Sequence, residues 1–288
     1  MPTPPGEFRG AGRILEGNCA AGIRAPRQRG GAFAVRYGRR RRTAVVVAVA
    51  LGLLVAGCGQ RANRDEPRVA YKELRDVPEA LDEDGTTIRV GDPEAPVTVH
   101  LYEDPRCPYC EEFEQTGGGP AARERTLGRT VVTEYTLASF LDGKLGGSGS
   151  ERAVNALRAA LEKGKFAEYH AVLYDNQPEE AVDGFTDAYL LKLADEVDGL
   201  RGPAFDSAVR TMKYRDFVSR SEKAYERAGG SENPGGPGTP TAAINGRRIV
   251  EMYGAVLYDR SMFDRLLKTV EQDPMAWDDD RSISQDMG

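Results

Sequence analysis

The 288-residue chain is poor in the residues that build disulfide frameworks and metal sites, with four cysteines and two histidines. An exported protein that relies on disulfides for stability normally carries more cysteines at wider spacing. A structural zinc site needs four ligands, usually Cys or His. This scarcity indicates that a closely spaced cysteine pair in this chain serves chemistry rather than architecture.

A long apolar run is also missing. The apolar stretch at 44–56 is shorter than the roughly 20 residues that a membrane-spanning helix needs. It follows Arg36 and an arginine run at 39–42, and it ends in Val-Ala-Gly-Cys at 55–58. A basic segment, a short apolar core and small residues before a cleavage point are typical of a secretory signal. We therefore predict an export signal at 1–57 in preference to a membrane span.

The tetrapeptide at 55–58 resembles the lipobox of bacterial lipoproteins. The resemblance implies that Cys58 is lipidated and tethers the cleaved protein to the outer face of the cytoplasmic membrane. Residues 1–34 lie upstream of a complete signal and show no hydrophobic periodicity. We infer that translation starts near Val35 or Arg36. Finding the earlier residues by N-terminal sequencing of an uncleavable precursor would contradict this.

Positive charge becomes scarce once the signal is removed. Residues 1–57 hold ten of the 39 basic residues and two of the 45 acidic ones, so the remaining 231 residues have a formal charge of −14. Such a surface repels nucleic acid and anionic lipid headgroups, which argues against a nucleic-acid partner. The length suffices for one domain with an insertion.

The exported part divides into a tether, a domain and a tail. The tether at 58–85 is charged and weakly patterned, and the tail at 273–288 is acidic. The domain at 86–272 contains strand-like runs, a helical block and a hairpin signal. We expect strands at 88–90, 97–102 and 131–137, and a hairpin that turns at Asn245-Gly246. We expect a helix at 108–127 with a break at 117–120, a helical block at about 148–228, and a last helix at 262–270.

Cys107 and Cys110 lie two residues apart, directly after a predicted strand and at the start of a predicted helix. A thiol exchanges with a disulfide only as the thiolate, and a helix N-terminus favours negative charge. We expect Cys107 to attack and Cys110 to resolve the mixed disulfide that forms. A CxxC beside a strand–helix–strand pattern is a fairly specific sign of this use.

The alternative for the same cysteines is half of a zinc site. Zinc would need two further ligands, and the exported part of the chain, with Cys58 lipidated, offers only His100 and His170, which are far apart and each within an apolar pattern. We interpret both histidines as packed residues and predict neither a metal nor a cofactor.

These motifs resemble those of the DsbA-like branch of the thioredoxin-fold disulfide oxidoreductases. The resemblance rests on Tyr-Glu-Asp-Pro-Arg-Cys-Pro-Tyr-Cys at 102–110, on Gly-Thr-Pro-Thr at 238–241 and on Ile-Asn-Gly at 244–246. It extends over about 86–272, and the helical block lies where this family carries a helical insertion. It implies an α/β thioredoxin fold with that insertion.

The resemblance also implies roles for particular residues. Pro108 and Tyr109 would support the dithiol from within the motif. Pro240 would be cis and lie against the cysteines, where the backbone of its neighbours binds the substrate strand. Thr239, the residue before it, would tune redox behaviour.

Two departures from the family leave the direction of reaction open. The buried acid that many relatives hold six residues before the first cysteine is Leu101 here, and Glu103 could replace it only with its side chain turned inward. Tyr109 stands in place of the histidine that helps to make the best-known DsbA strongly oxidising.

Three functions follow as hypotheses. The first is an oxidase that introduces disulfides into exported proteins and is reoxidised by a membrane redox partner. The second is a reductase or isomerase of the same fold, kept reduced from across the membrane. The third is a lipoprotein that uses the fold only to bind a peptide or a metal. The presence of both cysteines and of Thr239-Pro240 favours catalysis over binding.

Overall fold

The structure of the protein, a computed structural model, describes residues 69–249 and 251–274. Six strands form one mixed sheet in the order β1-β2-β4-β3-β5-β6, in which β3 and β4 are parallel and the other pairs are antiparallel. The strands are β1 (Glu79–Leu81), β2 (Ile88–Gly91), β3 (Val97–Glu103), β4 (Val131–Leu137), β5 (Thr241–Ile244) and β6 (Arg247–Arg248).

Side chains of β3 alternate between two environments. Val97, Val99, Leu101 and Glu103 are completely buried, whereas the three residues between them are half-buried. Successive side chains of a strand point to opposite faces of the sheet, so these four share the inner face. Glu103 therefore enters the core because it continues the alternation of the valines and leucine before it.

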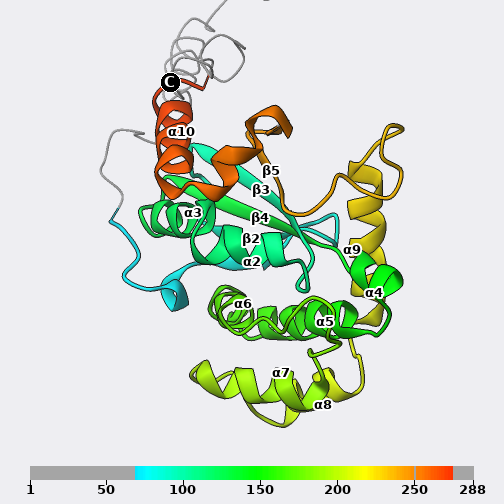
Figure 1. Ribbon diagram of the computed structural model, residues 1–288. Helices are drawn as coiled ribbons and strands as arrows, with labels where there is room; N and C mark the ends of the chain where they lie inside the picture. The colour runs from blue at the N-terminus through cyan, green and yellow to red at the C-terminus, as the bar shows by residue number, and fades with distance from the viewer. Residues whose placement is uncertain (1–68, 250, 275–288) are drawn as a thin grey trace, which may run out of the picture. The chain divides into compact units, whose positions relative to one another are not determined.

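The helix after β3 is interrupted, as the glycines at 117–119 predict. α2 (Pro108–Gln115) is followed by α3 (Gly118–Leu127), and Figure 1 shows both with α10 (Arg260–Gln272) in front of the strands. A Cβ added to Gly118 would come within 2.7 Å of the rings of Phe113 and Phe263, which pack edge to face. Only glycine fits at this crossing of α3 and α10.

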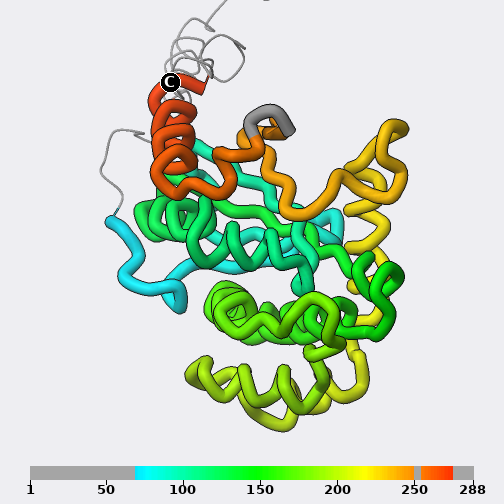
Figure 2. The backbone as a smooth tube through the Cα atoms, viewed as in Figure 1, coloured from blue at the N-terminus to red at the C-terminus, as the bar shows by residue number. Residues whose placement is uncertain are grey.

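The predicted helical block is present and lies between β4 and β5 in the chain. Figure 2 shows the chain leaving the sheet after β4, passing through these helices and returning to form β5. The helices are α4 (Phe140–Leu145), α5 (Gly149–Leu161), α6 (Phe166–Asp175), α7 (Asp187–Leu193), a 3₁₀ turn η2 (Ala194–Glu196), α8 (Pro203–Arg210) and α9 (Arg215–Ala228).

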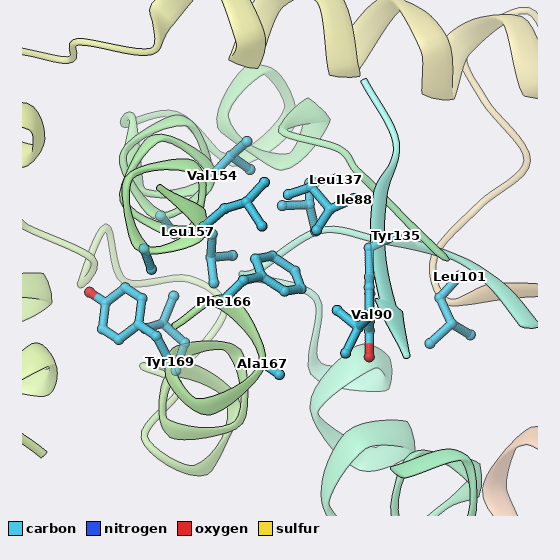
Figure 3. Close-up of a cluster of buried hydrophobic side chains, with 14 of the residues drawn as sticks. Ile88, Val90, Leu101, Tyr135, Leu137, Val154, Leu157, Phe166, Ala167 and Tyr169 are labelled. Atoms are coloured by element: carbon cyan, nitrogen blue, oxygen red, sulfur yellow. The ribbon is translucent and has the colours of Figure 1, made fainter. Parts of the chain in front are cut away.

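One hydrophobic core joins the sheet to the insertion. Figure 3 shows Leu137 of β4 on the side of the sheet that faces Leu157 of α5 and Phe166 of α6 across this core. Tyr135 contacts the Phe166 ring at a centroid distance of 5.2 Å. Because the insertion helices bury their apolar faces against the sheet, their side chains are held in fixed positions beside the end of β3.

The structure corrects the expectation that 58–85 is only a tether. Within that range the described residues form a 3₁₀ turn, η1 (Leu74–Asp76), and the edge strand β1, which pairs with β2. Glu79 of β1 also caps α6, accepting hydrogen bonds from the backbone N–H groups of Phe166 (2.8 Å) and Ala167 (2.7 Å). Three residues are too few to give a recognisable strand pattern, and their pairing depends on contacts distant in sequence.

Two further elements differ from the prediction. The 3₁₀ helix η3 (Glu251–Tyr258) and the short helix α4 were not predicted. None of the helices in 69–249 and 251–274 is both long and apolar enough to cross a membrane. The predicted export signal, Cys58 and the tail from 275 onward lie outside the described residues.

Candidate active site

The two cysteines lie where β3 gives way to α2. Cys107 is the N-cap residue of α2 and Pro108 is its first helical residue, an arrangement that suits a residue without a backbone N–H. Both thiols are free, with Cys107 5 % exposed and Cys110 completely buried. Cys107 is therefore the sulfur nearer to solvent, and Cys110 lies one turn further in.

The Cys107 sulfur is stabilised as a thiolate. Its pKa falls to about 6, first because of a hydrogen bond from the Cys110 thiol and further because of one from the Thr239 side chain. Backbone N–H groups of the first turn of α2 add to the effect, as expected at a helix N-terminus. At neutral pH most of the reduced protein thus presents an anionic nucleophile at Cys107.

The loop before β5 faces this sulfur. The Thr239–Pro240 bond is cis, as the family resemblance implies. In its protonated form, the Cys107 thiol donates a hydrogen bond of 3.3 Å to the Thr239 carbonyl. The structure therefore brings together Cys107, Cys110, Thr239 and Pro240, although 128 residues lie between Cys110 and Thr239 in the sequence.

Tyr109, between the two cysteines in the sequence, lies on the solvent-exposed side of the dithiol. Its side chain is 60 % exposed, and its ring meets that of Tyr258 edge-on at 6.3 Å. Burial raises the pKa of Tyr258 to about 12, so the Tyr258 ring is neutral at physiological pH. These two aromatic rings form a partly apolar surface beside Cys107.

Cys110 experiences the opposite electrostatic environment from Cys107. Burial raises its pKa well above the usual value, and the neighbouring Cys107 and Glu103 charges add to the shift. Cys110 is therefore a protonated thiol whenever the dithiol is reduced near neutral pH. Any step in which its sulfur changes charge needs a nearby proton acceptor or donor.

Behind the cysteines lies a group that we call the inner triad, Glu103, Glu114 and His170. Glu103 and His170 share a hydrogen bond of 2.9 Å between Oε2 and Nε2, and a hydrogen bond also joins the two carboxyl groups. Burial raises the pKa of Glu103 to about 8 and that of Glu114 to about 7, and it lowers the pKa of His170 to about 4. Arg123 forms an ion pair with Glu114.

The inner triad is short of a proton donor when both carboxyls are ionised. Oε1 of Glu103 is buried without a hydrogen-bond partner among the described residues. Arg123 supplies one positive charge against two carboxylates, and His170 is neutral at pH 7. A proton shared between the two carboxyls removes the excess negative charge.

The loop between β3 and α2 is fixed to the insertion by two buried charged residues. Asp104 accepts hydrogen bonds from the Ser150 hydroxyl (2.6 Å), from the backbone N–H of Arg106 (3.0 Å) and from that of Leu141 (3.1 Å). Arg106 forms an ion pair of 2.7 Å with Asp142. Burial raises the pKa of Asp104 to about 7.

Gln177, just after α6, secures the backbone of the motif itself. Its side-chain amide donates to the carbonyl oxygens of Pro105 (2.6 Å) and Cys107 (3.1 Å). The Tyr174 hydroxyl reaches the Asp104 carbonyl at 3.4 Å. The insertion thus positions the dithiol through hydrogen bonds as well as apolar packing.

The zinc alternative can be compared with the described residues. Among them, one group of three potential ligands comes together, and it is the inner triad, whose ligand atoms lie within 4.8 Å of one another. Neither cysteine belongs to it. Within the inner triad, the Glu103–His170 hydrogen bond and the Arg123 ion pair already engage part of the ligand set.

Sequence reasoning missed most of the support around the dithiol. Glu114 could have been found, because it follows Cys110 by four residues and so shares its helix face. His170 was interpreted as a packed residue, and the structure adds a polar partner, Glu103, to its aromatic neighbours. No local signal connects Gln177 or His170 with the motif, since both reach it only through the fold.

Comparison with known proteins supports the expected fold. A protein-family profile described as Thioredoxin matches residues 83–268, and the chain belongs to this family. The fold resembles that of BdbD from Bacillus subtilis, with a TM-score of 0.53, 17% identity, and coverage of 71% of this chain and 100% of BdbD. It also resembles MdbA, a thiol-disulfide oxidoreductase from Corynebacterium diphtheriae, with a TM-score of 0.50, 19% identity, and coverage of 69% and 98%. The predicted α/β thioredoxin fold with a DsbA-like helical insertion is confirmed.

A curated relative is much longer than this chain. The Na(+)/H(+) antiporter NhaA 3 of Salinispora tropica is 30% identical over 183 residues, which cover 62% of this chain and 24% of the antiporter. The chain thus spans about a quarter of the length of the curated relatives it matches.

Proposed function

We propose that this protein is a thiol–disulfide oxidoreductase that oxidises thiols of exported proteins through Cys107 and Cys110. The observation that carries the proposal is the Cys107 sulfur at the N-cap of α2, with its pKa lowered to about 6. Stabilising the thiolate stabilises the reduced form, and a protein with a stable reduced form is an oxidant. The name of the fold relative MdbA, a thiol-disulfide oxidoreductase, is consistent with this chemistry.

In the oxidising direction, a substrate thiolate attacks Cys107 of the disulfide. The bond between Cys107 and Cys110 breaks, a mixed disulfide forms, and Cys110 leaves as a thiolate. Glu103 supports this step as the proton donor to Cys110, because it is buried beside it and holds a proton near neutral pH. A second substrate thiolate then releases Cys107, and a membrane redox partner reoxidises the dithiol.

The reduction potential tests this proposal. The full chain, with Cys19→Ser and Cys58→Ser so that only the dithiol reacts, is equilibrated in glutathione buffers, and Cys107→Ser is the control. A value of about −120 to −150 mV is expected for an oxidant, and one near −270 mV would make the protein a reductase. Absence of exchange would favour the binding lipoprotein.

We also propose that the protein is held at the outer face of the cytoplasmic membrane through lipidated Cys58. The support is the basic segment, apolar core and lipobox-like tetrapeptide in the sequence. Labelling of cells with a radioactive fatty acid should mark the wild-type protein and leave Cys58→Ser unlabelled. Equal labelling of both proteins would contradict the proposal.

A further inference from the structure

A narrow hollow lies beside the inner triad, away from the exposed side of the dithiol. It is lined by Leu74, Val90, Arg123, Thr126, Thr133, Tyr135, Ala167 and His170. Its volume is about 10 Å³, at the lower limit for one water molecule. Leu74 of η1 and Arg123 of α3 are partly exposed, so the hollow lies close to the surface between these two elements.

The lining of the hollow suits a water molecule. A buried water needs two to four polar partners, and the hydroxyls of Thr126 and Thr133, which lie 3.2 Å apart, are joined there by Arg123 and His170. His170 is thus common to the hollow and to the inner triad. Its Nε2 bonds to Glu103 on the inner side.

The hollow and the substrate-facing side of the dithiol lie over different parts of the sheet. The hollow lies over β2 and β4, whereas Thr239 precedes β5, and β3 separates β4 from β5. Two strand spacings correspond to about 10 Å. No residue of the hollow belongs to the surface formed by Cys107, Tyr109, Thr239 and Tyr258.

We propose that the inner triad is a proton relay in which His170 passes protons between the Glu103–Glu114 pair and solvent through this hollow. The proposal rests on the proposed function and deepens it. It gives Cys110 an exchange route with water that stays open while a substrate polypeptide covers Cys107.

The proton balance of the relay follows from the exchange step. When the Cys107–Cys110 bond breaks and Cys110 leaves as a thiolate, the carboxyl pair gives it one proton. The pair regains that proton from His170, which takes another from water in the hollow at its second ring nitrogen. On reoxidation the same proton leaves Cys110 by the reverse route, so no other reactant is consumed.

The groups that surround the relay come from several elements. They are Glu103 of β3, Glu114 of α2, Arg123 of α3, Tyr135 of β4 and Tyr174 of α6, in addition to His170. Burial raises the pKa of both tyrosines well above the usual value, so neither competes for the proton. A cation within the triad is the alternative occupant, and its presence is a measurable outcome.

The test compares His170→Gln with His100→Gln in the full chain carrying Cys19→Ser and Cys58→Ser. Glutamine can still hydrogen-bond to Glu103 but cannot relay a proton between two ring nitrogens. His100 is the other histidine of the chain and lies on the opposite face of β3 from Glu103. Single-turnover oxidation of a two-cysteine peptide, and the reverse reaction, are followed by acid quench, alkylation and mass spectrometry.

We expect His170→Gln to slow both directions by the same factor, about 10-fold or more, as loss of a proton-transfer group does. The equilibrium constant with glutathione should stay unchanged, and the solvent isotope effect in D₂O should rise. His100→Gln should match the wild type. A structural or purely electrostatic role for His170 would instead change the equilibrium constant.

A second variant leaves the inner triad intact in case His170→Gln does not fold. Thr126→Val removes a hydroxyl from the hollow with little change of shape, and it should also slow both directions without altering the equilibrium constant. Wild-type rates in both variants would overturn the relay while leaving oxidoreductase activity in place. Stoichiometric metal in the purified wild type that is lost in Glu114→Gln would also overturn it. No glutathione exchange by the wild type would refute the proposed function itself.

Discussion

On each face of the central sheet a histidine pairs with a glutamate, and the pKa values of the two glutamates shift in opposite directions. On the half-buried face, His100 Nδ1 lies 3.3 Å from Glu134, with side-chain exposures of 21 % and 19 %. On the inner face, His170 Nε2 lies 2.9 Å from Glu103, with exposures of 3 % and 0 %. The pKa of Glu134 is lowered, first by its hydrogen bond with His100, whereas burial raises that of Glu103.

The comparison teaches that burial, rather than the presence of a histidine, decides which way a paired carboxyl shifts. Glu134 keeps access to water and also contacts Arg89 at 3.4 Å, so its charged form is favoured. Glu103 is shielded from solvent and lies beside a second acid, Glu114, so its neutral form is favoured. Only the inner pair can hold an exchangeable proton near neutral pH beside a buried thiol.

The largest expected effect is on the rate of thiol–disulfide exchange. Glu103→Gln keeps a hydrogen-bonding group beside His170 but has no proton to give, so exchange should slow by at least about 10-fold. Glu134→Gln, the matched change on the other face, should leave the rate near that of the wild type. Stopped-flow or quenched exchange with glutathione provides the measurement. Equal rates in the two variants would remove Glu103 from the mechanism.

The next effect concerns stability and its dependence on pH. Folded Glu103 keeps its proton up to about pH 8, whereas the unfolded chain loses it near about pH 4.3. The burial of Glu103 therefore costs stability progressively as pH rises through that window. Glu103→Gln removes this loss, so its stability relative to the wild type should rise with pH.

Glu134 should show the opposite sign. Because its pKa is lowered in the folded state, it contributes stability above its unfolded pKa, and this contribution is lost as pH falls through the folded value. Glu134→Gln should therefore lose stability relative to the wild type as pH rises. Urea unfolding of the reduced proteins between about pH 2.5 and pH 8 measures both trends, because the window for Glu134 lies below its unfolded pKa and that for Glu103 above it. Parallel curves for the two variants would contradict the comparison.

A smaller effect is expected at the outer sulfur. The absorbance of the Cys107 thiolate should titrate with a midpoint near pH 6 in the wild type. Cys110→Ala removes the hydrogen bond that contributes most to this shift, so the midpoint should rise. His100→Gln should leave it unchanged. A midpoint that does not move in Cys110→Ala would assign the thiolate's stability to the helix N-terminus and Thr239 instead.

The smallest effect comes from Glu79 at the edge of the sheet. Glu79→Ala removes the cap of α6 and should cost about 1 kcal/mol of folding stability. His170 lies one turn beyond the capped residues Phe166 and Ala167, so hydrogen exchange at its amide should quicken. Exchange at His100, in the middle of β3, provides the internal control. Unchanged protection in α6 would show that the cap is dispensable.

Much of this arrangement could be predicted from local patterns. The strand before Cys107, the helix beginning at Pro108, its break at the glycines and the Asn245-Gly246 turn all have signals within a few residues. The period of two in β3 also places Glu103 on the side of Val99 and Leu101.

The residues that hold the active site in place could not be predicted in this way. The partners of Glu103 and Cys107, namely His170 and Gln177, come from the insertion and are about 70 residues away in the chain. A single sequence contains no local preference that encodes such a pairing. It arises because the insertion packs its apolar face on the sheet, which decides where its polar residues arrive.

The edge strand has a final consequence for what counts as the domain. Similarity to the thioredoxin family begins at residue 83, whereas Glu79 already acts on the helix that carries His170. The stretch that similarity recognises is therefore smaller than the stretch that works as one unit. A transplant of residues 83–268 into another protein would therefore include the dithiol but lack the Glu79 cap of α6, the helix that positions His170.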